Sequence, residues 1–372
     1  MSRLASNSRT EISSRPNAMR VGGLSLSVLG ILTPSATAAV FRDWYPEYAS
    51  IFQSTLEAQC STEHSAWLAG SPPLPEDYAA NGTTSARQAV VQCILSNTSE
   101  FMKANMASAA VLLGIMPFAL SVLGSSSEES ALLYVIGRRP ILTTLLLAGA
   151  PVVVALRPFE YKDPVGILRA REGRFYSFNM GPSWLVLLLE YLVALASVAN
   201  VVHVTYGLGV GVTTMILPDS SYLPGVWAGS GIIVHIIGAL CLKSRLRLLT
   251  PKNEPILKSE LTLSTDKNIT VETVPETKRF LALSWLTSTS TTFHVIFGTL
   301  AFSSMQFISV RDAFGVIGRY TASVTICRVV LMYELSGLRS GVESTSTLPA
   351  PDDGQDPVDG LKAGPRVFTF AP

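Results

Sequence analysis

The chain has 372 residues, of which 48% are hydrophobic and only 15% are charged, and its formal net charge is +1. Soluble domains carry about 25% charged residues, so this composition is typical of a membrane protein. A nearly neutral chain lacks the positive field that nucleic acids attract, so no nucleic-acid partner is expected. Continuous apolar runs without period-two alternation also exclude a transmembrane β-barrel.

The first 39 residues are predicted to be a targeting segment. A short apolar run at 21–32 follows four arginines, and the small residues Ala36-Thr37-Ala38 come after it. This order of basic, apolar and small residues is typical of a secretory signal peptide. Two alternatives stay open. One is an uncleaved anchor, and the other is a mitochondrial presequence, because residues 1–20 are rich in Ser and Arg.

Residues 40–105 are predicted to form a small helical module, because two stretches of it have apolar side chains at helical spacing. A module of this size buries little core. Cys60 and Cys93 are expected to form a disulfide that holds it together, provided that it faces a lumen or the cell exterior. On the same condition, the module carries N-glycosylation sequons at Asn81 and Asn97.

Five apolar runs predict transmembrane helices, at about 107–123, 140–156, 184–217, 225–242 and 283–310. About 20 apolar residues suffice for a helix to cross roughly 30 Å of hydrocarbon, and lipid forces the backbone to bond within the helix. The third run is longer than one perpendicular crossing needs, so it tilts, extends beyond the bilayer or breaks near Gly207–Gly211. The expected fold class is all-α, a polytopic transmembrane helix bundle with a small N-terminal extramembrane helical module.

The chain after the fifth run predicts one more helix and a disordered tail. Residues 313–335 are apolar but contain Arg319, Arg328 and Glu334, and three charges make a crossing expensive. An amphipathic helix at the interface or against the bundle is therefore expected, with a sixth span as the alternative. Residues 337–372 are rich in Pro, Gly, Ser and Asp, so a disordered tail is expected there.

Two signals of topology conflict. A cleaved signal peptide places the module outside, and five spans then leave the loops 157–182 and 243–279 on the same side. These loops carry five and eight basic residues, although basic residues favour cytoplasmic loops. Inverting the whole chain makes both basic loops cytosolic, but it also places the sequons and the cysteine pair in the cytosol. Splitting the third run into two short helices makes only the loop 243–279 cytosolic and leaves 157–182 outside. The signal-led orientation is preferred, because the first translocated segment usually orients the rest.

Four ionisable residues within the runs form the candidate intramembrane polar site, namely Glu190, His203, His235 and His294. An ionisable group in a span is a functional hypothesis by default. We predict that Glu190 faces the bundle and has a polar partner, and a position at the headgroups is the alternative. Three histidines from separate spans suit a proton or metal site, but none has ligand spacing, so contacts between helices are expected instead.

Catalytic motifs do not occur: the chain contains no GxSxG, HExxH, P-loop or CxxC. No catalytic, metal or cofactor site is assigned, and an enzyme is not expected. Gly207-Leu-Gly-Val-Gly211 lacks the strand and acidic residue of a dinucleotide loop, so it predicts a helix-packing face, as does the pair Gly225 and Gly229. Trp184, Trp227 and Trp285 near span ends are expected to be interfacial anchors.

Three stretches resemble an uncharacterised family of multi-pass membrane proteins from filamentous fungi. They are 93–158 (CILSNTSEFMKANMASAAVLLGIMPFALSVLGSS, RRPILTTLLLAGAP and RP within it), 159–164 (FEYKDP) and 328–335 (RVVLMYEL). The resemblance covers most of the chain beyond residue 40. It implies an organismal context and a membrane fold, but no activity.

The expected function is that of a non-enzymatic membrane scaffold or sensor, which lies in the lipid bilayer and contacts proteins through its module or tail. A small-solute or proton-linked transporter is the alternative, and a membrane-embedded lipid-modifying enzyme is the third possibility. The expected location is the secretory pathway or plasma membrane, with a mitochondrial membrane as the alternative. Convergence of Glu190 with the histidines on a water-filled cavity favours transport, whereas a dry bundle favours the scaffold.

Overall fold

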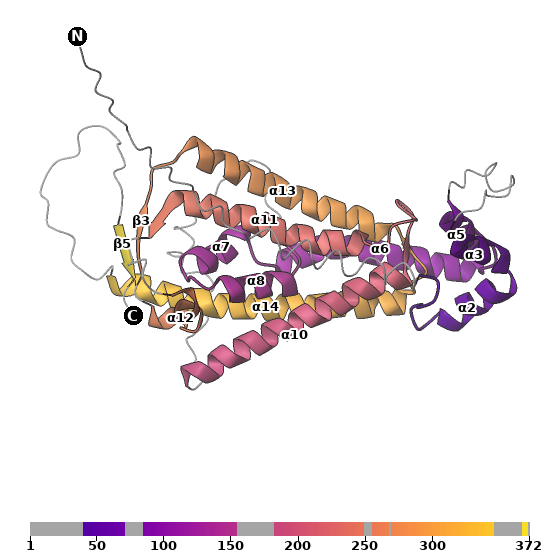
Figure 1. Ribbon diagram of the computed structural model, residues 1–372, viewed down its shortest axis with the longest axis horizontal. Coiled ribbons are helices and arrows are strands. Elements are labelled where there is room, and N and C mark those ends of the chain that lie inside the picture. The colour runs from indigo at the N-terminus through magenta and orange to yellow at the C-terminus, as the bar shows by residue number, and fades with distance from the viewer. Residues whose placement is uncertain are drawn as a thin grey trace, which may run out of the picture.

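The structure, a computed structural model, describes residues 40–70, 85–154, 182–248, 255–267, 269–345 and 367–370. The targeting segment 1–39 and Asn81 lie outside the described residues. Five long helices lie side by side in one bundle (Figure 1): α6 (Glu100–Leu123), α10 (Ser183–Gly211), α11 (Leu223–Arg245), α13 (Lys278–Ser303) and α14 (Val310–Thr345). Among the described residues, four helices are long and apolar enough to cross a membrane, namely α6, α10, α11 and residues 310–338 of α14.

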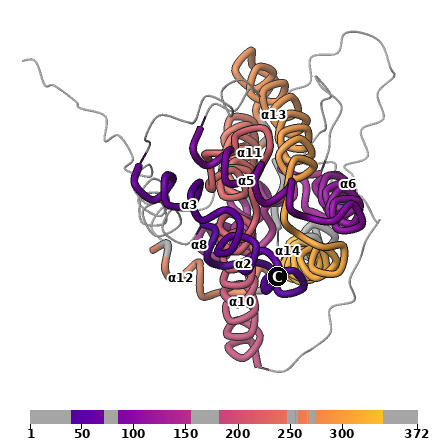
Figure 2. Tube along the Cα trace, turned by 90° about the vertical axis from the view of Figure 1, so that its right-hand side faces the viewer, coloured from indigo at the N-terminus to yellow at the C-terminus, as the bar shows by residue number. Residues whose placement is uncertain are grey.

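The module end of the bundle is the end where α6 and α14 begin. The module helices lie there, α2 (Ala49–Ala58), α3 (Ser61–Leu68) and α5 (Ala86–Ser96), as Figures 1 and 2 show. The backbone N–H of Val310 donates to Asn105 Oδ1 over 3.0 Å, and Ser309 Oγ donates to Glu47 Oε2 over 2.7 Å. The short strands β1 (Thr213–Thr214) and β4 (Met305–Gln306) pair antiparallel at the same end. The bond from Ser309 to Glu47 fixes the module to the bundle, and the β1–β4 pair ties two connections of the bundle together.

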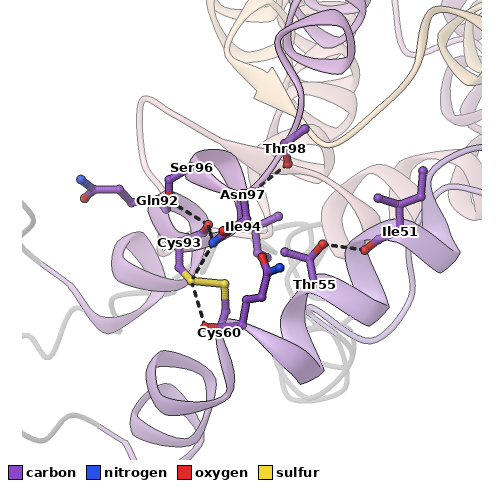
Figure 3. The surroundings of a disulfide bond; sticks show 10 residues. Ile51, Thr55, Cys60, Gln92, Cys93, Ile94, Ser96, Asn97 and Thr98 are labelled. Carbon is purple, nitrogen blue, oxygen red and sulfur yellow. Dashed lines mark hydrogen bonds between the residues drawn. A yellow bond between two sulfur atoms is a disulfide. The ribbon is translucent and has the colours of Figure 1, made fainter.

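The disulfide predicted for the module is present. Cys60 and Cys93 are bonded, with Cα atoms 5.9 Å apart, and the bond joins the start of α3 to α5 (Figure 3). Both cysteines are buried in a small aromatic core that includes Phe52 and Phe307. Phe307 comes from the turn between α13 and α14, so the core of the module extends into the bundle.

Two half-length helices form a hairpin inside the bundle. They are α7 (Ser127–Val135), which starts with a capping box of Ser126 and Glu129, and α8 (Pro140–Gly149). At 1.5 Å per residue each is about 15 Å long, roughly half of a membrane crossing. The N–H of Val154 donates to Ser125 O over 3.3 Å, so the chain leaves the hairpin beside the point where it entered.

The predicted span at 140–156 is therefore wrong in length. The helix ends at Gly149 because Pro151 follows closely, and a proline removes a backbone donor and disfavours helical geometry at the residue before it. The long run from 184 behaves differently, since α10 is one continuous helix of 29 residues that ends at Gly211. A break within it at Gly207–Gly211 is not observed.

The C-terminal region also differs from the expectation. Residues 313–335 belong to α14, which has 36 residues and packs along α10, α6 and α8 and does not lie flat at an interface. The alternative, a sixth span, fits this helix. Residues 337–345, predicted to be disordered, belong to α14, which continues to Thr345; 346–366 and 371–372 lie outside the described residues. Strand β5 (Val367–Phe370) pairs with β3 (Ile269–Thr273), which also pairs with β2 (Leu246–Leu248).

Candidate functional site

A buried arginine ties three helices together. Arg139 immediately precedes α8, and its side chain is 0% exposed. Its Nη1 donates to Glu190 Oε2 on α10 over 2.9 Å and to Glu334 Oε1 on α14 over 2.7 Å. Both carboxylates are also buried, at 5% and 1% exposed. Buried charges are tolerated only when they are paired, so these three residues belong to one ionic unit.

The loop between α11 and α13 adds a second layer of polar contacts. Glu260, at the end of α12 (Ile256–Glu260), accepts hydrogen bonds from the N–H of Leu142 and from Tyr191 Oη, each over 2.7 Å. A carboxylate at this place also meets the positive end of the α8 dipole. Ser264 Oγ donates to the second oxygen of Glu334.

Lys267 completes this layer at the turn between α7 and α8. Its Nζ donates to Gly137 O over 2.6 Å and to Ser259 O. Burial lowers the pKa of Lys267 to about 8, because it disfavours the charged form, and the nearby Arg139 lowers the pKa further. We call Arg139, Glu190, Glu334, Glu260 and Lys267 the Arg139 cluster, and the end of the bundle that contains it the charged end.

The Arg139 cluster is incompletely paired. It holds three carboxylates and two cations. Among the described residues, Arg139 Nε and Nη2, Glu190 Oε1 and Glu260 Oε2 are buried without a hydrogen-bond partner. A buried polar atom without a partner costs about 1–3 kcal/mol, and internal water is the usual way in which proteins satisfy such atoms. The geometry thus suits a few ordered waters between Arg139 and its carboxylates.

The sequence-derived polar site is divided by the structure into three places. Glu190 lies inside the bundle with a polar partner, the position that the sequence favoured. His235 and His294 lie elsewhere in the interior: His235 Nδ1 is 2.7 Å from Ser130 Oγ, and His294 stacks on the ring of Trp227. His203 is exposed on the outer face of α10. Within the described residues, no group of His, Cys, Asp and Glu could hold a metal ion.

The two interior histidines lie against the extended segment that follows α8. His235 Nε2 is 3.4 Å from Val152 O, and a Cβ on Gly231 would lie 3.2 Å from Pro151 O and 3.4 Å from His294 Cε1. A second ion pair, partly buried, joins α14 to the first turn of α7, where Arg328 binds both oxygens of Glu129. The interior histidines therefore help to pack the hairpin, consistent with the expected contacts between helices.

Several other expectations about single residues are corrected. Trp227 is 0% exposed and packs on Phe302 and Tyr320, so it is no interfacial anchor, whereas Trp184 and Trp285 are 67% and 42% exposed. A Cβ added to Gly225 or Gly229 would meet nothing within 4 Å, so that pair forms no packing face.

The Gly207–Gly211 motif does pack closely. A Cβ at Gly211 would lie 3.2 Å from the ring of Tyr45. This face of α10 thus receives the first residues of the module, as a small-residue face allows.

Sequence reasoning missed the partners of Glu190. Arg139 lies just before Pro140 and an apolar run, the usual place of a loop charge, and Glu334 enters the sequence analysis only as a cost of crossing. The signal that could have found them is the presence of opposite charges in apolar surroundings, since such charges occur in pairs. Glu260 and Lys267 gave no signal, because they lie in a long charged loop.

The comparisons with known proteins add no assignment. No family model matches the chain, and no curated protein or solved structure does either. Membership of a fungal membrane-protein family remains a prediction, and the function is inferred from the geometry.

Proposed function

We propose that the protein is a non-enzymatic integral membrane scaffold of the secretory pathway or plasma membrane. It holds the disulfide-stapled module on the external or lumenal side and the charged end in the cytosol. The observation that carries this proposal is the partner of Glu190: the carboxylate is bound by Arg139 and joins α8, α10 and α14. It does not converge with the histidines on a cavity, as a transport site was expected to do.

The surface of the bundle supports a position in lipid. The outer face of α10 exposes a row of large aliphatic side chains at 45–55% of their area, namely Leu185, Leu188, Leu189, Leu192 and Leu195. Extended apolar surfaces of this kind mark contact with lipid or with another protein. Helix α13 is less apolar, but it is long enough to cross. Its Thr287 and Thr291 hydroxyls donate to backbone carbonyls one turn earlier, so their hydrogen-bonding capacity is satisfied within the helix.

The hairpin supports an orientation in which the two topology signals agree. If α7 continues from α6 to the charged end, and α8 leads back into the bundle only partway before the chain returns to the charged end at the start of α10, the chain crosses the bilayer five times. The turn at Arg138-Arg139, the start of α10 and the loop from α11 to α13 then lie on one side, and the module lies on the other. The basic loops become cytosolic, and the connection from α10 to α11 outside contains no basic residue. The positive-inside rule and the signal peptide then agree.

A glycosylation assay tests this orientation in cells. We expect removal of N-glycans to increase the gel mobility of the protein, and Asn81→Gln to abolish most of that shift. Asn97→Gln is expected to matter little, because Asn97 Nδ2 donates to Cys93 O over 3.0 Å and the residue lies three positions before α6. An unshifted parent protein whose module is cleaved by a cytosolic protease would contradict the orientation.

Proton-linked transport is the second candidate, and one feature favours it. Half-helices and extended backbone inside a bundle are common at transport sites, and Arg139 and Glu190 retain buried polar atoms without partners. The packing argues against it. The structure has a recess of about 570 Å³ between α6 and α13 and one of about 420 Å³ at the module end, and neither is lined by Glu190, His235 or His294.

Reconstitution separates the two candidates. Full-length protein in liposomes is exposed to a pH gradient, and an internal pH dye reports proton flux, with empty liposomes and Glu190→Gln protein as controls. A scaffold predicts the same flux in all three preparations. If the parent protein gives more proton flux than empty liposomes, and Glu190→Gln protein does not, the protein is a transporter and the scaffold proposal is wrong.

A further inference from the structure

A recess at the module end contains an unpaired arginine. The recess has a volume of about 420 Å³ and lies between the last turns of α10, the first turns of α14 and the start of the module. Its polar lining consists of Asp43, Tyr45, His203, Tyr206, Arg311, Asp312 and Arg319. Glycines at 207, 211 and 315 also line it; Gly207 and Gly211 admit Tyr45, and Gly315 leaves space open, since a Cβ there would meet nothing within 4 Å.

Arg319 is held so that its terminal nitrogens remain available. Its Nε donates to Asn200 Oδ1 over 2.8 Å, and Asn200 Nδ2 donates back to Arg319 O over 2.9 Å and to Ser323 Oγ over 2.8 Å. No carboxylate of the described residues forms an ion pair with Arg319. Asp312, the acidic residue of α14 in the recess, already accepts from Ser309 Oγ and from the N–H of Glu47.

The surroundings of Arg319 are partly apolar and exposed. The recess is lined by Val204, Val210 and Val316 beside the exposed His203, and both helices expose apolar side chains elsewhere on their surface, such as Val202 at 47% and Phe314 at 59%. Arg319 lies nine residues into α14, about 14 Å from its start, and His203 lies about 12 Å before the end of α10. Since α10 is about 43 Å long and hydrocarbon is about 30 Å thick, both residues lie near the boundary of the leaflet on the module side.

We propose that this recess binds the phosphate of a membrane phospholipid in the leaflet on the module side. Arg319 is the principal ligand, because a guanidinium can donate two parallel hydrogen bonds to phosphate oxygens. Arg311 adds a second positive charge at the rim, and the acyl chains lie along the exposed apolar surface of the two helices. Asp43 and Asp312 also line the recess, but among the described residues neither forms an ion pair with Arg319, and an arginine without such a pair at this depth is costly. The proposal rests on the membrane position proposed above and is independent of the scaffold role.

The test uses full-length protein in detergent and native mass spectrometry with added phosphatidylcholine. We expect one lipid to remain bound, and we expect diacylglycerol with the same acyl chains, which lacks the phosphate, to bind at least tenfold more weakly. Inorganic phosphate at the same concentration should not displace the lipid. Equal retention of diacylglycerol, or displacement by inorganic phosphate, would overturn the proposal, because either result removes the phospholipid as the specific ligand.

Three variants locate the site. Arg319→Met should weaken phosphatidylcholine binding about tenfold, and Arg319→Lys should weaken it less, since a point charge remains. Gly315→Leu should block binding by filling the recess, and it should fold, because a Cβ there meets nothing within 4 Å. Arg42→Met is the matched control: Arg42 is an exposed module arginine outside the recess. Unchanged binding in both Arg319→Met and Gly315→Leu would refute this location.

If the proposed membrane position is wrong, the glycosylation assay gives the contradicting result. The lipid binding measured in detergent does not depend on that assay or on the scaffold role. The two failures are therefore distinguishable. Loss of lipid retention in Arg42→Met to the same degree as in Arg319→Met would show that any surface arginine suffices, and this result would also refute the proposal.

Discussion

Replacing Arg139 by methionine removes the cation that two buried carboxylates share. Breaking a buried ion pair costs about 3–5 kcal/mol, because the remaining charge stays buried without compensation. Arg139 serves both Glu190 and Glu334, so we expect a loss of unfolding free energy toward the upper part of that range. Glu190→Gln keeps the size of the side chain and leaves Arg139 paired with Glu334, so its cost should be only about 1 kcal/mol.

Denaturant unfolding of the full chain in detergent micelles measures these costs. Trp227 is a suitable fluorescent reporter, because its indole is fully buried in the bundle core. The control is Arg279→Met, since Arg279 is exposed in the first turn of α13, and surface changes usually stay within about 0.5 kcal/mol. The reasoning is refuted if Arg139→Met is as stable as the control, or if Glu190→Gln destabilises the protein more than Arg139→Met does.

Three further predictions concern other parts of the molecule. Cys60→Ala should cost the module about 3–4 kcal/mol, because the disulfide closes a loop with a sequence separation of 33; mass spectrometry of unreduced peptides checks the pairing, and two free thiols would contradict it. Gly298→Ala should lower the free energy of unfolding by about 1–3 kcal/mol through overpacking, because its Cβ would lie 2.3 Å from Trp227 Nε1. Gly225→Ala is the control and should be harmless, since its Cβ meets nothing within 4 Å. Equal effects of the two changes in thermal unfolding would refute this packing. Stability should rise between about pH 8 and pH 10, because over this range Lys267 is mainly neutral when folded and still protonated when unfolded; Lys267→Met should flatten this part of the profile, and an unchanged slope would show that another group causes it.

Long apolar runs and local spacing made much of the helical architecture predictable. The run from 184 and the module helices follow from local periodicity, and the Cys60–Cys93 pairing follows from two cysteines in one small polar segment. The hairpin was not predictable in the same way. The run from 140 has the composition of a span. Its helix ends before Pro151, and the chain after it lies beside Ser125, a contact that the sequence does not reveal.

The candidate site was harder to predict because its members are far apart in the sequence. Arg139 and Glu334 are nearly 200 positions apart, and only the packing of α8 against α14 brings them together. Glu190 was singled out because a lone carboxylate in a span needs a partner, but which partner it has depends on tertiary structure. The histidines show the reverse case: their presence in apolar runs suggested a shared site, while the helix geometry directs His203 outward and His235 inward.

The sidedness of three positions tests the central claim most directly, which is that α8 does not cross the bilayer, so that the turn between α7 and α8 and the start of α10 lie on the same side. The buried thiols of Cys241 and Cys327 are first replaced by alanine. Single cysteines at Arg138, Asp219 and Arg279 are then labelled with a membrane-impermeant maleimide in sealed, oriented vesicles. The account predicts that positions 138 and 279 react from the cytosolic side and position 219 from the opposite side. Labelling of position 279 from the external side and position 219 from the cytosolic side would mean that residues 140–156 cross the membrane, and would contradict the account.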